Sequence, residues 1–134
     1  MSKTILQTVI FKNTAPETLY DIYMDAKKHS KATGGTAKIS AKVGSSYSAW
    51  DGYITGKTFQ LVKGKLIVQS WRDSEFKPND LDSTFILQFE KKGKDALVHM
   101  VHANVPDHKY EALKGGWNGF YWKPWKKYLA GSGK

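Results

Sequence analysis

Cysteine is absent from the 134 residues, and arginine occurs once, as Arg72. Without cysteine the chain forms neither disulfides nor thiolate metal sites, and it has no cysteine nucleophile. The remaining basic residues are all lysines, which lack the planar guanidinium fork used to recognise base edges and phosphates, so specific nucleic-acid binding is not expected. The lysines are spread over the whole chain, and the net charge of +9 therefore predicts a diffuse positive field suited to an acidic protein partner.

Long apolar runs are also missing. The first residues lead into a short alternation of apolar and polar side chains, and we expect neither a signal peptide nor a membrane-spanning segment. The expected location is the cytoplasm. The length is sufficient for one domain with its own core, which we place at residues 1–130. Residues 131–134, rich in glycine and serine, are expected to form a flexible tail.

The longest periodic stretch is the last one, Lys109 to Ala130. Apolar side chains recur there every three or four residues, as in an amphipathic helix: Tyr110, Leu113, Trp117, Phe120, Tyr121, Trp125, Tyr128 and Leu129. About twenty residues of helix span roughly 30 Å, the width of a small domain, so we expect the core to be organised around this element. Bends are expected near Gly115 and near Pro124, because glycine weakens a helix and proline cannot donate to the carbonyl four residues before it.

The N-terminal part predicts a strand followed by a helix. Residues Thr4 to Lys12 alternate with β-branched neighbours, as strands do. Thr14 then stands where a capping residue would, with Pro16 in the first turn and Glu17 three residues after the cap. We expect a helix or helix pair to begin here and to end near Gly34–Gly35.

From Thr36 onwards the pattern changes to period two. Six β-prone runs separated by turn residues follow: Ala37–Lys42, Ser46–Trp50, Tyr53–Val62, Lys65–Arg72, Ser83–Lys91 and Ala96–Val105. Connections this short join antiparallel strands. The order of elements therefore predicts an α+β fold, in which a curved antiparallel sheet wraps around the C-terminal helix and buries one of its faces.

The buried face can be assigned from the alternation. On the fifth run Phe85, Leu87 and Phe89 form the apolar face. On the last run the choice lies between two sets: Ala96, Val98, Met100 and His102, or Leu97, His99, Val101 and Ala103. We favour the first set, because the apolar members of the second include none larger than leucine.

Four segments carry a resemblance: Trp50–Gly56, Lys65–Arg72, Val98–Pro106 and Gly116–Trp122. Together with the helix start at Ala15–Glu17, they resemble the C-terminal-domain family of the activator of Hsp90 ATPase, within the START and Bet v 1-like helix-grip superfamily. The resemblance covers nearly the whole chain. It implies a seven-stranded antiparallel sheet gripping the C-terminal helix, an apolar cavity between them, and two small helices after the first strand.

The functional expectation follows from this resemblance. The chain looks like the stand-alone, mostly bacterial members, which lack the N-terminal domain of the full co-chaperone, and for these the resemblance implies a fold and a pocket rather than an agreed substrate. We expect a non-enzymatic protein, a monomer or weak dimer, that holds a small hydrophobic ligand between sheet and helix. The alternatives are a co-chaperone-type module that contacts an acidic chaperone partner, and an enzyme acting on a hydrophobic compound.

The candidate cavity residues are aromatic, apolar and amide side chains on the expected inner surfaces: Trp50, Phe59, Gln69, Trp71, Phe85, Leu87, Val98, Met100, His102, Trp117, Phe120 and Tyr121. The large aromatic ones are either plain core or cavity walls. His102, expected near Gln69, could orient a ligand, or it could be a structural histidine bonded to a neighbour.

Signatures of catalysis, metals and cofactors are missing from the sequence. No nucleophile elbow, phosphate-binding loop, dinucleotide fingerprint or HExxH motif occurs. His99 and His102 are three apart on an expected strand and should point to opposite faces, so they would not chelate one metal ion. We therefore expect neither a metal nor a cofactor.

Overall fold

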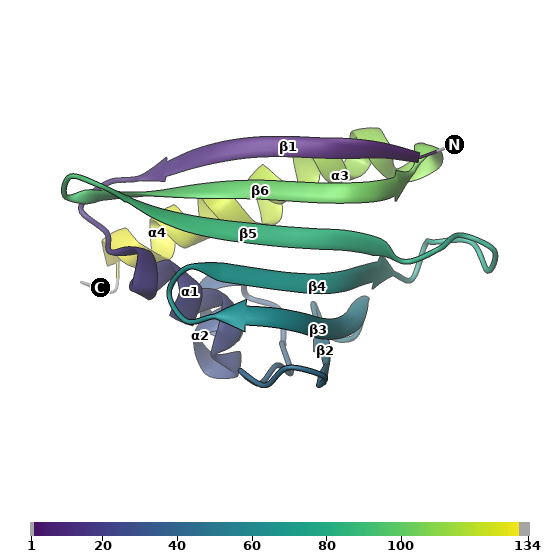
Figure 1. Ribbon diagram of the computed structural model, residues 1–134, viewed down its shortest axis with the longest axis horizontal. Helices are drawn as coiled ribbons and strands as arrows, with labels where there is room; N and C mark the ends of the chain where they lie inside the picture. Colours follow the sequence, from purple (N-terminus) through teal and green to yellow (C-terminus); the bar gives the residue numbers. More distant parts are fainter. Residues whose placement is uncertain (1, 132–134) are drawn as a thin grey trace.

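The computed structural model describes residues 2–131, and its strands form one antiparallel sheet (Figure 1). The sheet has six strands in the order β1-β6-β5-β4-β3-β2. Their bounds are β1 Ser2–Phe11, β2 Ser46–Ala49, β3 Ile54–Val62, β4 Leu66–Asp73, β5 Ser83–Lys92 and β6 Asp95–Pro106. Strands β2 to β6 follow one another as a meander, and β1 adds to the free edge of β6.

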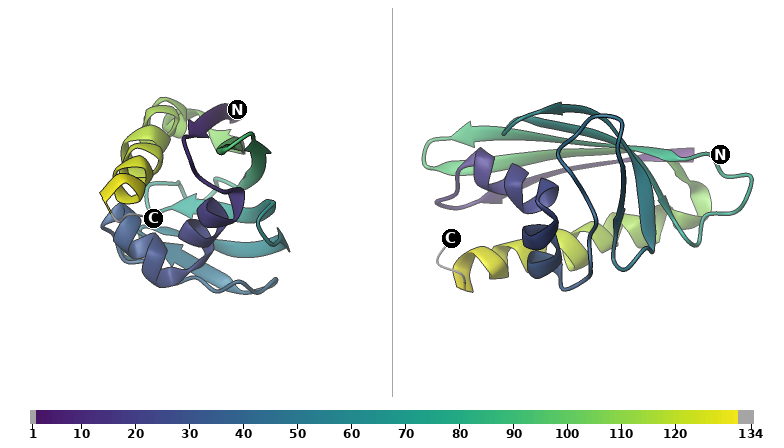
Figure 2. Two further views of the ribbon diagram at one scale, coloured as in Figure 1. Left: turned by 90° about the vertical axis from the view of Figure 1, so that its left-hand side faces the viewer. Right: turned by 90° about the horizontal axis from the view of Figure 1, so that it is seen from below.

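The helices all lie on one side of the curved sheet, as both views in Figure 2 show. Two short helices, α1 (Pro16–Met24) and α2 (Ala26–Thr33), separate β1 from β2. The C-terminal helix consists of four consecutive parts: the 3-10 turn η1 (Asp107–Lys109), α3 (Tyr110–Trp117), the π-helical segment η2 (Asn118–Trp122) and α4 (Lys123–Gly131). The expected α+β arrangement, a curved sheet around a long C-terminal helix, is confirmed.

The favoured register of β6 is also confirmed. Ala96, Val98, Met100 and His102 are all buried against the helices, and their cross-strand partners on β5 include Phe89, Leu87 and Phe85. On β4 the inward set is Ile67, Gln69 and Trp71, again fully buried. Because side chains alternate along a strand, one correct assignment fixes the faces of neighbouring strands.

The seventh strand expected at Ala37–Lys42 does not form; residues 37–42 are all described, and they make one isolated bridge, from Lys38 to Ser48. The backbone N–H of Ala37 donates instead to the Ser30 hydroxyl. At the other end of the segment Lys42 donates to the carbonyl of Ser40, so the chain turns before a ladder can grow. The residues of this segment are suited to a strand, but hydrogen bonds to a helix side chain and within a tight turn take the place of strand pairing.

Thr14 does not cap the first helix. Its hydroxyl donates to the carbonyl of Lys12, and the N-cap position of α1 falls on Ala15, which has no side-chain cap. The proline in the first turn is where it was expected, since Pro16 opens the helix and needs no hydrogen-bond acceptor. The side-chain cap occurs one helix later, where Asp25 accepts from the backbone N–H of Lys28.

The C-terminal helix is irregular in one place rather than two. It continues without a break through Gly115. The irregular part, η2, ends at Trp122, two residues before Pro124, and the backbone N–H of Lys123 donates to the carbonyl of Asn118, five residues back. A π-helical segment at this point accommodates the missing N–H and the ring of the proline. Gln7 of β1 supports the segment, because its amide donates to the carbonyl of Lys114 and accepts from the indole of Trp122.

Gly131, the first residue of the expected tail, is the last residue of α4. Residues 132–134 lie outside the described residues. Within residues 2–131, none of the helices combines the length and apolar character needed to cross a membrane.

Candidate functional site

A pocket of about 340 Å³ opens between the C-terminal helix and the β3–β4 side of the sheet. One wall comes from α3 and η2, and the other from the β2–β3 turn and the facing ends of β3 and β4. It is lined by Trp50, Tyr53, Ile54, Trp71, Glu75, Lys109, Ala112, Leu113, Gly116, Trp117, Phe120 and Tyr121. Six of these twelve residues are aromatic. A concave, mostly aromatic surface with a few polar groups is the usual composition of a small-molecule site.

Trp50 stands at the exposed side of this pocket, in the turn between β2 and β3. Its φ is +51°, a left-handed conformation that costs a bulky residue of order 1–3 kcal/mol. The indole packs directly against Gly35. A Cβ atom added there would lie 2.4 Å from Trp50 Cε3, so a larger residue would displace the ring. Phe120, half exposed on η2, meets the indole edge to face with ring centroids 5.5 Å apart. Strained backbone at a pocket is a feature of functional sites.

The indole N–H of Trp50 is buried and has no hydrogen-bond partner among the described residues. Burial raises the pKa of the Tyr121 hydroxyl, and the Trp50 indole acts in the opposite direction. The two groups are therefore close, although their geometry falls short of a hydrogen bond. A buried donor without an acceptor costs about 1–3 kcal/mol, so the position of the Trp50 indole is not explained by its own hydrogen bonding.

The floor of the pocket is a stack of aromatic rings. Trp117 lies parallel to Phe85, with 4.5 Å between ring centroids and an interplanar angle of 6°. Trp71 packs against Trp117 at 5.9 Å. Because Phe85 belongs to β5, the ring of Trp117 is held by the sheet and not by its own helix alone.

His102 lies beneath this stack, with both ring nitrogens in hydrogen bonds. The hydroxyl of Ser83 donates to the carbonyl of Trp71 at 2.7 Å, so it accepts from His102 Nε2–H at 2.8 Å. The other nitrogen, Nδ1, then accepts the indole N–H of Trp117 at 3.1 Å. These bonds fix one neutral tautomer and leave His102 no free nitrogen.

Burial lowers the pKa of His102 to about 3. The ring is fully buried and does not border the pocket, so it has no access to a ligand. The expected proximity to Gln69 is indirect, because Phe85 pairs with both residues and lies between them. The geometry is that of a structural histidine, and it does not support a catalytic base.

A second buried histidine, His29, is hydrogen-bonded to Tyr121 of η2. His29 Nδ1–H donates to the carbonyl of Tyr23 at 2.8 Å, and Nε2 accepts the hydroxyl of Tyr121 at 3.0 Å. Burial lowers the pKa of His29 to about 4, against the opposing effect of the Tyr23 carbonyl. Tyr23 continues the network by donating to Gln69 at 2.8 Å. Sequence reasoning missed His29, because a histidine between lysines on a polar helix has the appearance of a surface residue.

The polar edge of the pocket is an ion-pair cluster around Lys109. Its ammonium lies 3.1 Å from Asp73 Oδ2, in contact with Glu75 Oε1 and 3.4 Å from the Tyr53 hydroxyl. The carboxylate of Asp73 is completely buried, whereas that of Glu75 is 65% exposed. Burial lowers the pKa of Lys109, but the two carboxylates more than offset this, and the pKa lies above its ordinary value.

The candidate residues from the sequence divide into three groups. Those that border the pocket are Trp50, Trp71, Trp117, Phe120 and Tyr121. A second group is buried in the packed core beside it: Gln69, Phe85, Leu87, Val98, Met100 and His102. Phe59 is displaced from both. It lies at a register shift in β3 and is 54% exposed, since the extra residue there turns its side chain away from the helices.

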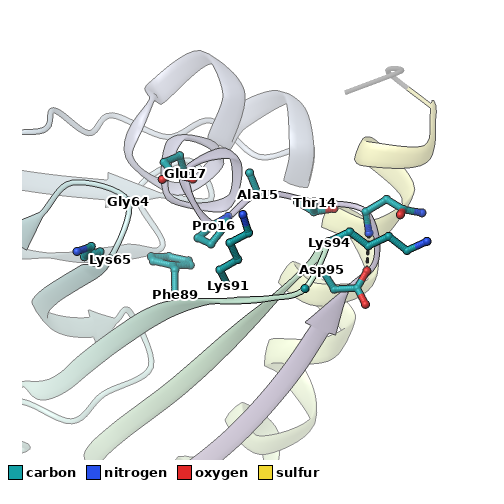
Figure 3. Close-up of a pocket in the computed structure, with 12 residues that line it drawn as sticks. Thr14, Ala15, Pro16, Glu17, Gly64, Lys65, Phe89, Lys91, Lys94 and Asp95 are labelled. Carbon is teal, nitrogen blue, oxygen red and sulfur yellow. Dashed lines mark hydrogen bonds between the residues drawn. The ribbon is translucent and has the colours of Figure 1, made fainter.

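A separate depression lies where β1 leads into α1 and faces the β3–β4 and β5–β6 turns (Figure 3). Its volume is about 690 Å³, and its rim carries charged residues, among them Glu17, Lys65, Lys91 and Lys94. Asp95 is already engaged there by the backbone N–H of Asn13 at 2.8 Å. The depression has a charged rim, and in the described part of the chain Phe89 is its one aromatic lining residue, against six in the pocket beside α3.

Among residues 2–131, no three histidine or acidic side chains come together in a way that could hold a metal ion. The pairing of Ser83 with His102 is not a nucleophile and base, because the hydroxyl is buried and donates to a backbone carbonyl. The site therefore offers aromatic side chains and one cluster of charges for binding.

The comparison with known protein families shows to which family the chain belongs. Residues 13–130 match the family described as Activator of Hsp90 ATPase homolog 1-like protein. The chain belongs to this family. The match covers α1 through α4, and therefore every residue of the pocket, so the family resemblance expected from the four sequence segments is confirmed.

Individual members of the activator family are similar over most of this chain. The human activator of 90 kDa heat shock protein ATPase homolog 1 is 27% identical over 110 residues, which are 82% of this chain and 32% of that protein. The chain thus spans about a third of the length of the curated relatives it matches. Among solved structures, an HSP90 activator from Plasmodium falciparum has a TM-score of 0.85 and 25% identity, with 95% of this chain and 96% of that chain covered.

A more distant relative shares the fold. The solution structure of the Aha1 dimer from Colwellia psychrerythraea has a TM-score of 0.73 and 18% identity, covering 90% of this chain and 92% of the other. At this identity the likeness is one of architecture. The fold of this chain is therefore shared with both of these solved structures.

Proposed function

We propose that this chain binds a small, mainly apolar ligand in the pocket between α3 and the β3–β4 side of the sheet. The observation that carries the proposal is the aromatic lining of a hollow of about 340 Å³, at the small end of the range of roughly 300–1,000 Å³ typical of ligand sites. The left-handed backbone of Trp50, which borders the pocket, supports it. No side chain in the pocket forms a base and nucleophile pair, so the proposed activity is binding without catalysis.

Two neighbouring glycines provide a matched experiment. Gly116 lines the pocket, and a Cβ added there would meet Phe120 Cδ2 at an ordinary contact distance of 3.7 Å. Gly115 is in the same helix but outside the lining, and a Cβ there would meet nothing within 4 Å. Leucine at either position should favour the helix by roughly 1 kcal/mol, so the two variants differ mainly in the space they fill.

The measurement is a titration with N-phenyl-1-naphthylamine, a neutral fluorescent probe. We expect saturable binding to the wild-type protein, retained by Gly115→Leu and lost in Gly116→Leu, with both variants folded by circular dichroism. Absence of saturable binding to the wild-type protein, or equal binding to both variants, would remove the basis for a ligand site here.

A second candidate is contact with a chaperone of the Hsp90 type. It is favoured by the family and by the likeness to an HSP90 activator over nearly the full length of both chains, and the net charge of +9 suits an acidic partner. Addition of the purified chain to an Hsp90 from the same organism should raise its ATPase rate if this candidate holds. An unchanged rate at excess chain would count against it. A cytoplasmic location and a monomeric or weakly dimeric state stay predictions.

A further inference from the structure

The charged edge of the pocket is unlike the rest of the molecule. The whole chain carries +9, but the ionisable groups at this edge are one lysine and two carboxylates: Lys109 and Glu75 in the lining, and Asp73 directly behind them. Their formal charges sum to −1. At physiological ionic strength the Debye length is about 8 Å, so distant surface lysines are largely screened and the local groups dominate what a ligand meets.

Lys109 is not available to an anionic ligand. Its ammonium donates hydrogen bonds to Glu75 and Tyr53, and it forms an ion pair with Asp73 at 3.1 Å. The side chain is only 6% exposed. An anion would have to displace a carboxylate and would then lie beside the buried charge of Asp73, which disfavours it.

Glu75, by contrast, is open to a ligand. Its carboxylate is 65% exposed, and hydrogen bonds from Lys109 and Tyr53 hold its pKa below the ordinary value, so it is ionised at neutral pH. It can accept a hydrogen bond from a ligand while it remains paired with Lys109, because a carboxylate has about four lone-pair positions.

The walls favour the same kind of ligand. The faces of aromatic rings carry negative charge density and attract cations, tryptophan most strongly. Three tryptophans, two tyrosines and a phenylalanine line the pocket. We infer that the pocket prefers organic cations, namely small apolar molecules that carry an ammonium group, to neutral or anionic molecules of the same size. This inference rests on the proposed ligand-binding function and specifies the chemistry of its ligand.

The test compares three compounds of similar size in 0.15 M salt, where the Debye length is about 8 Å. They are 2-phenylethylammonium, the neutral 2-phenylethanol and the anionic 3-phenylpropanoate. Dissociation constants come from chemical-shift titration of the wild-type protein. We expect the cation to bind about tenfold more tightly than the alcohol, a ratio in the range of a desolvated cation–π contact with an added carboxylate, and the anion to bind most weakly.

Two charge variants locate the effect. Glu75→Gln should abolish most of the advantage of the cation over the alcohol, while leaving the affinity for the alcohol unchanged. Glu17→Gln removes the same charge from the rim of the other depression and should preserve the advantage. Gly116→Leu should weaken binding of all three compounds, which assigns them to the pocket.

The outcomes separate the two proposals. If the alcohol binds in the pocket and the cation binds no more tightly, the preference for cations is wrong and the ligand-binding function stands. If none of the three compounds perturbs the wild-type protein, both are overturned. A cation advantage that persists in Glu75→Gln and disappears in Glu17→Gln would also contradict the inference.

Discussion

The indole N–H of Trp117 donates to Nδ1 of His102 across 3.1 Å, and this bond joins the C-terminal helix to β6 of the sheet. On the other side of the imidazole, Ser83 passes the chain of hydrogen bonds on to the carbonyl of Trp71. Trp117 and Trp71 both line the pocket. His102, which does not border the pocket, thus holds the Trp117 ring by a hydrogen bond and packs edge to face against the Trp71 ring.

Removal of the His102 ring should therefore destabilise the fold. In His102→Ala, Trp117 loses its acceptor and a cavity opens in the core, so we expect a loss of about 3–5 kcal/mol in urea unfolding. His102→Gln, which can still accept from Trp117 and donate to Ser83, should recover part of this. Equal losses in both variants would show that volume matters and the hydrogen bonds do not.

Acid should destabilise the protein through its two buried histidines. The pKa values of His29 and His102 are lowered to about 4 and about 3, from about 6.5 in an unfolded chain. The unfolded state therefore binds more protons below pH 6.5, and stability falls as the pH falls from there toward 4. Each histidine adds a slope of about 1.4 kcal/mol per pH unit at most.

The measurement is urea unfolding at a series of pH values between 7 and 4.5. The wild-type free energy of unfolding should be nearly level above pH 6.5 and should then decline. In His102→Gln the decline should have about half the wild-type slope, since one of the two histidines remains. A variant slope equal to that of the wild type would mean that His102 does not contribute in this window.

Lys109 should be required for stability far more than its exposed partner. Lys109→Met leaves the completely buried carboxylate of Asp73 without its counter-ion, and loss of one member of a buried pair costs roughly 3–5 kcal/mol. Glu75→Gln removes an exposed partner, whose contribution is weakened by solvent, and should cost much less. Thermal or urea unfolding of the two variants gives the comparison, and similar small losses would place the cluster among ordinary surface ion pairs.

Much of the fold could be predicted from the sequence because it depends on local periodicity. Alternation on β6 placed Met100 and His102 inward, and a period of three to four residues identified the C-terminal helix. Pro124 signalled the irregular turn, although not that it would be π-helical. The strand expected at residues 37–42 was wrong, because this segment is held by a hydrogen bond to the Ser30 hydroxyl and by a turn. Periodicity in the sequence does not reveal such contacts.

The site was harder to predict, since its position depends on how the helix crosses the sheet. Trp117 and Phe85 stack over β5, and the pocket opens beside them, toward β3 and β4. The charged edge had a weak sequence signal at most: Asp73 and Glu75 follow one strand and Lys109 precedes the helix. Nothing in one sequence says that segments 34 residues apart meet.

Met100 illustrates the difference between an inward residue and a pocket residue. It faces the helices as expected, but it is fully buried and lies outside the pocket lining. Met100→Trp should therefore overpack the core and cost about 1–3 kcal/mol, while probe binding beside α3 persists. Loss of probe binding without loss of stability would instead indicate that the ligand space extends to β6.

The central claim is that the pocket beside α3 takes up a small apolar molecule, and the indole signals of the protein test it most directly. The chain has five tryptophans, of which Trp50, Trp71 and Trp117 line the pocket, while Trp122 and Trp125 do not. Their N–H resonances can be assigned by single substitutions to phenylalanine and followed during titration with 2-phenylethanol. We expect saturable shifts for the three lining indoles, largest for Trp50, whose N–H has no partner among the described residues, and none for Trp122 and Trp125. Shifts confined to Trp122 and Trp125, or no shift in any of the five, would contradict the account.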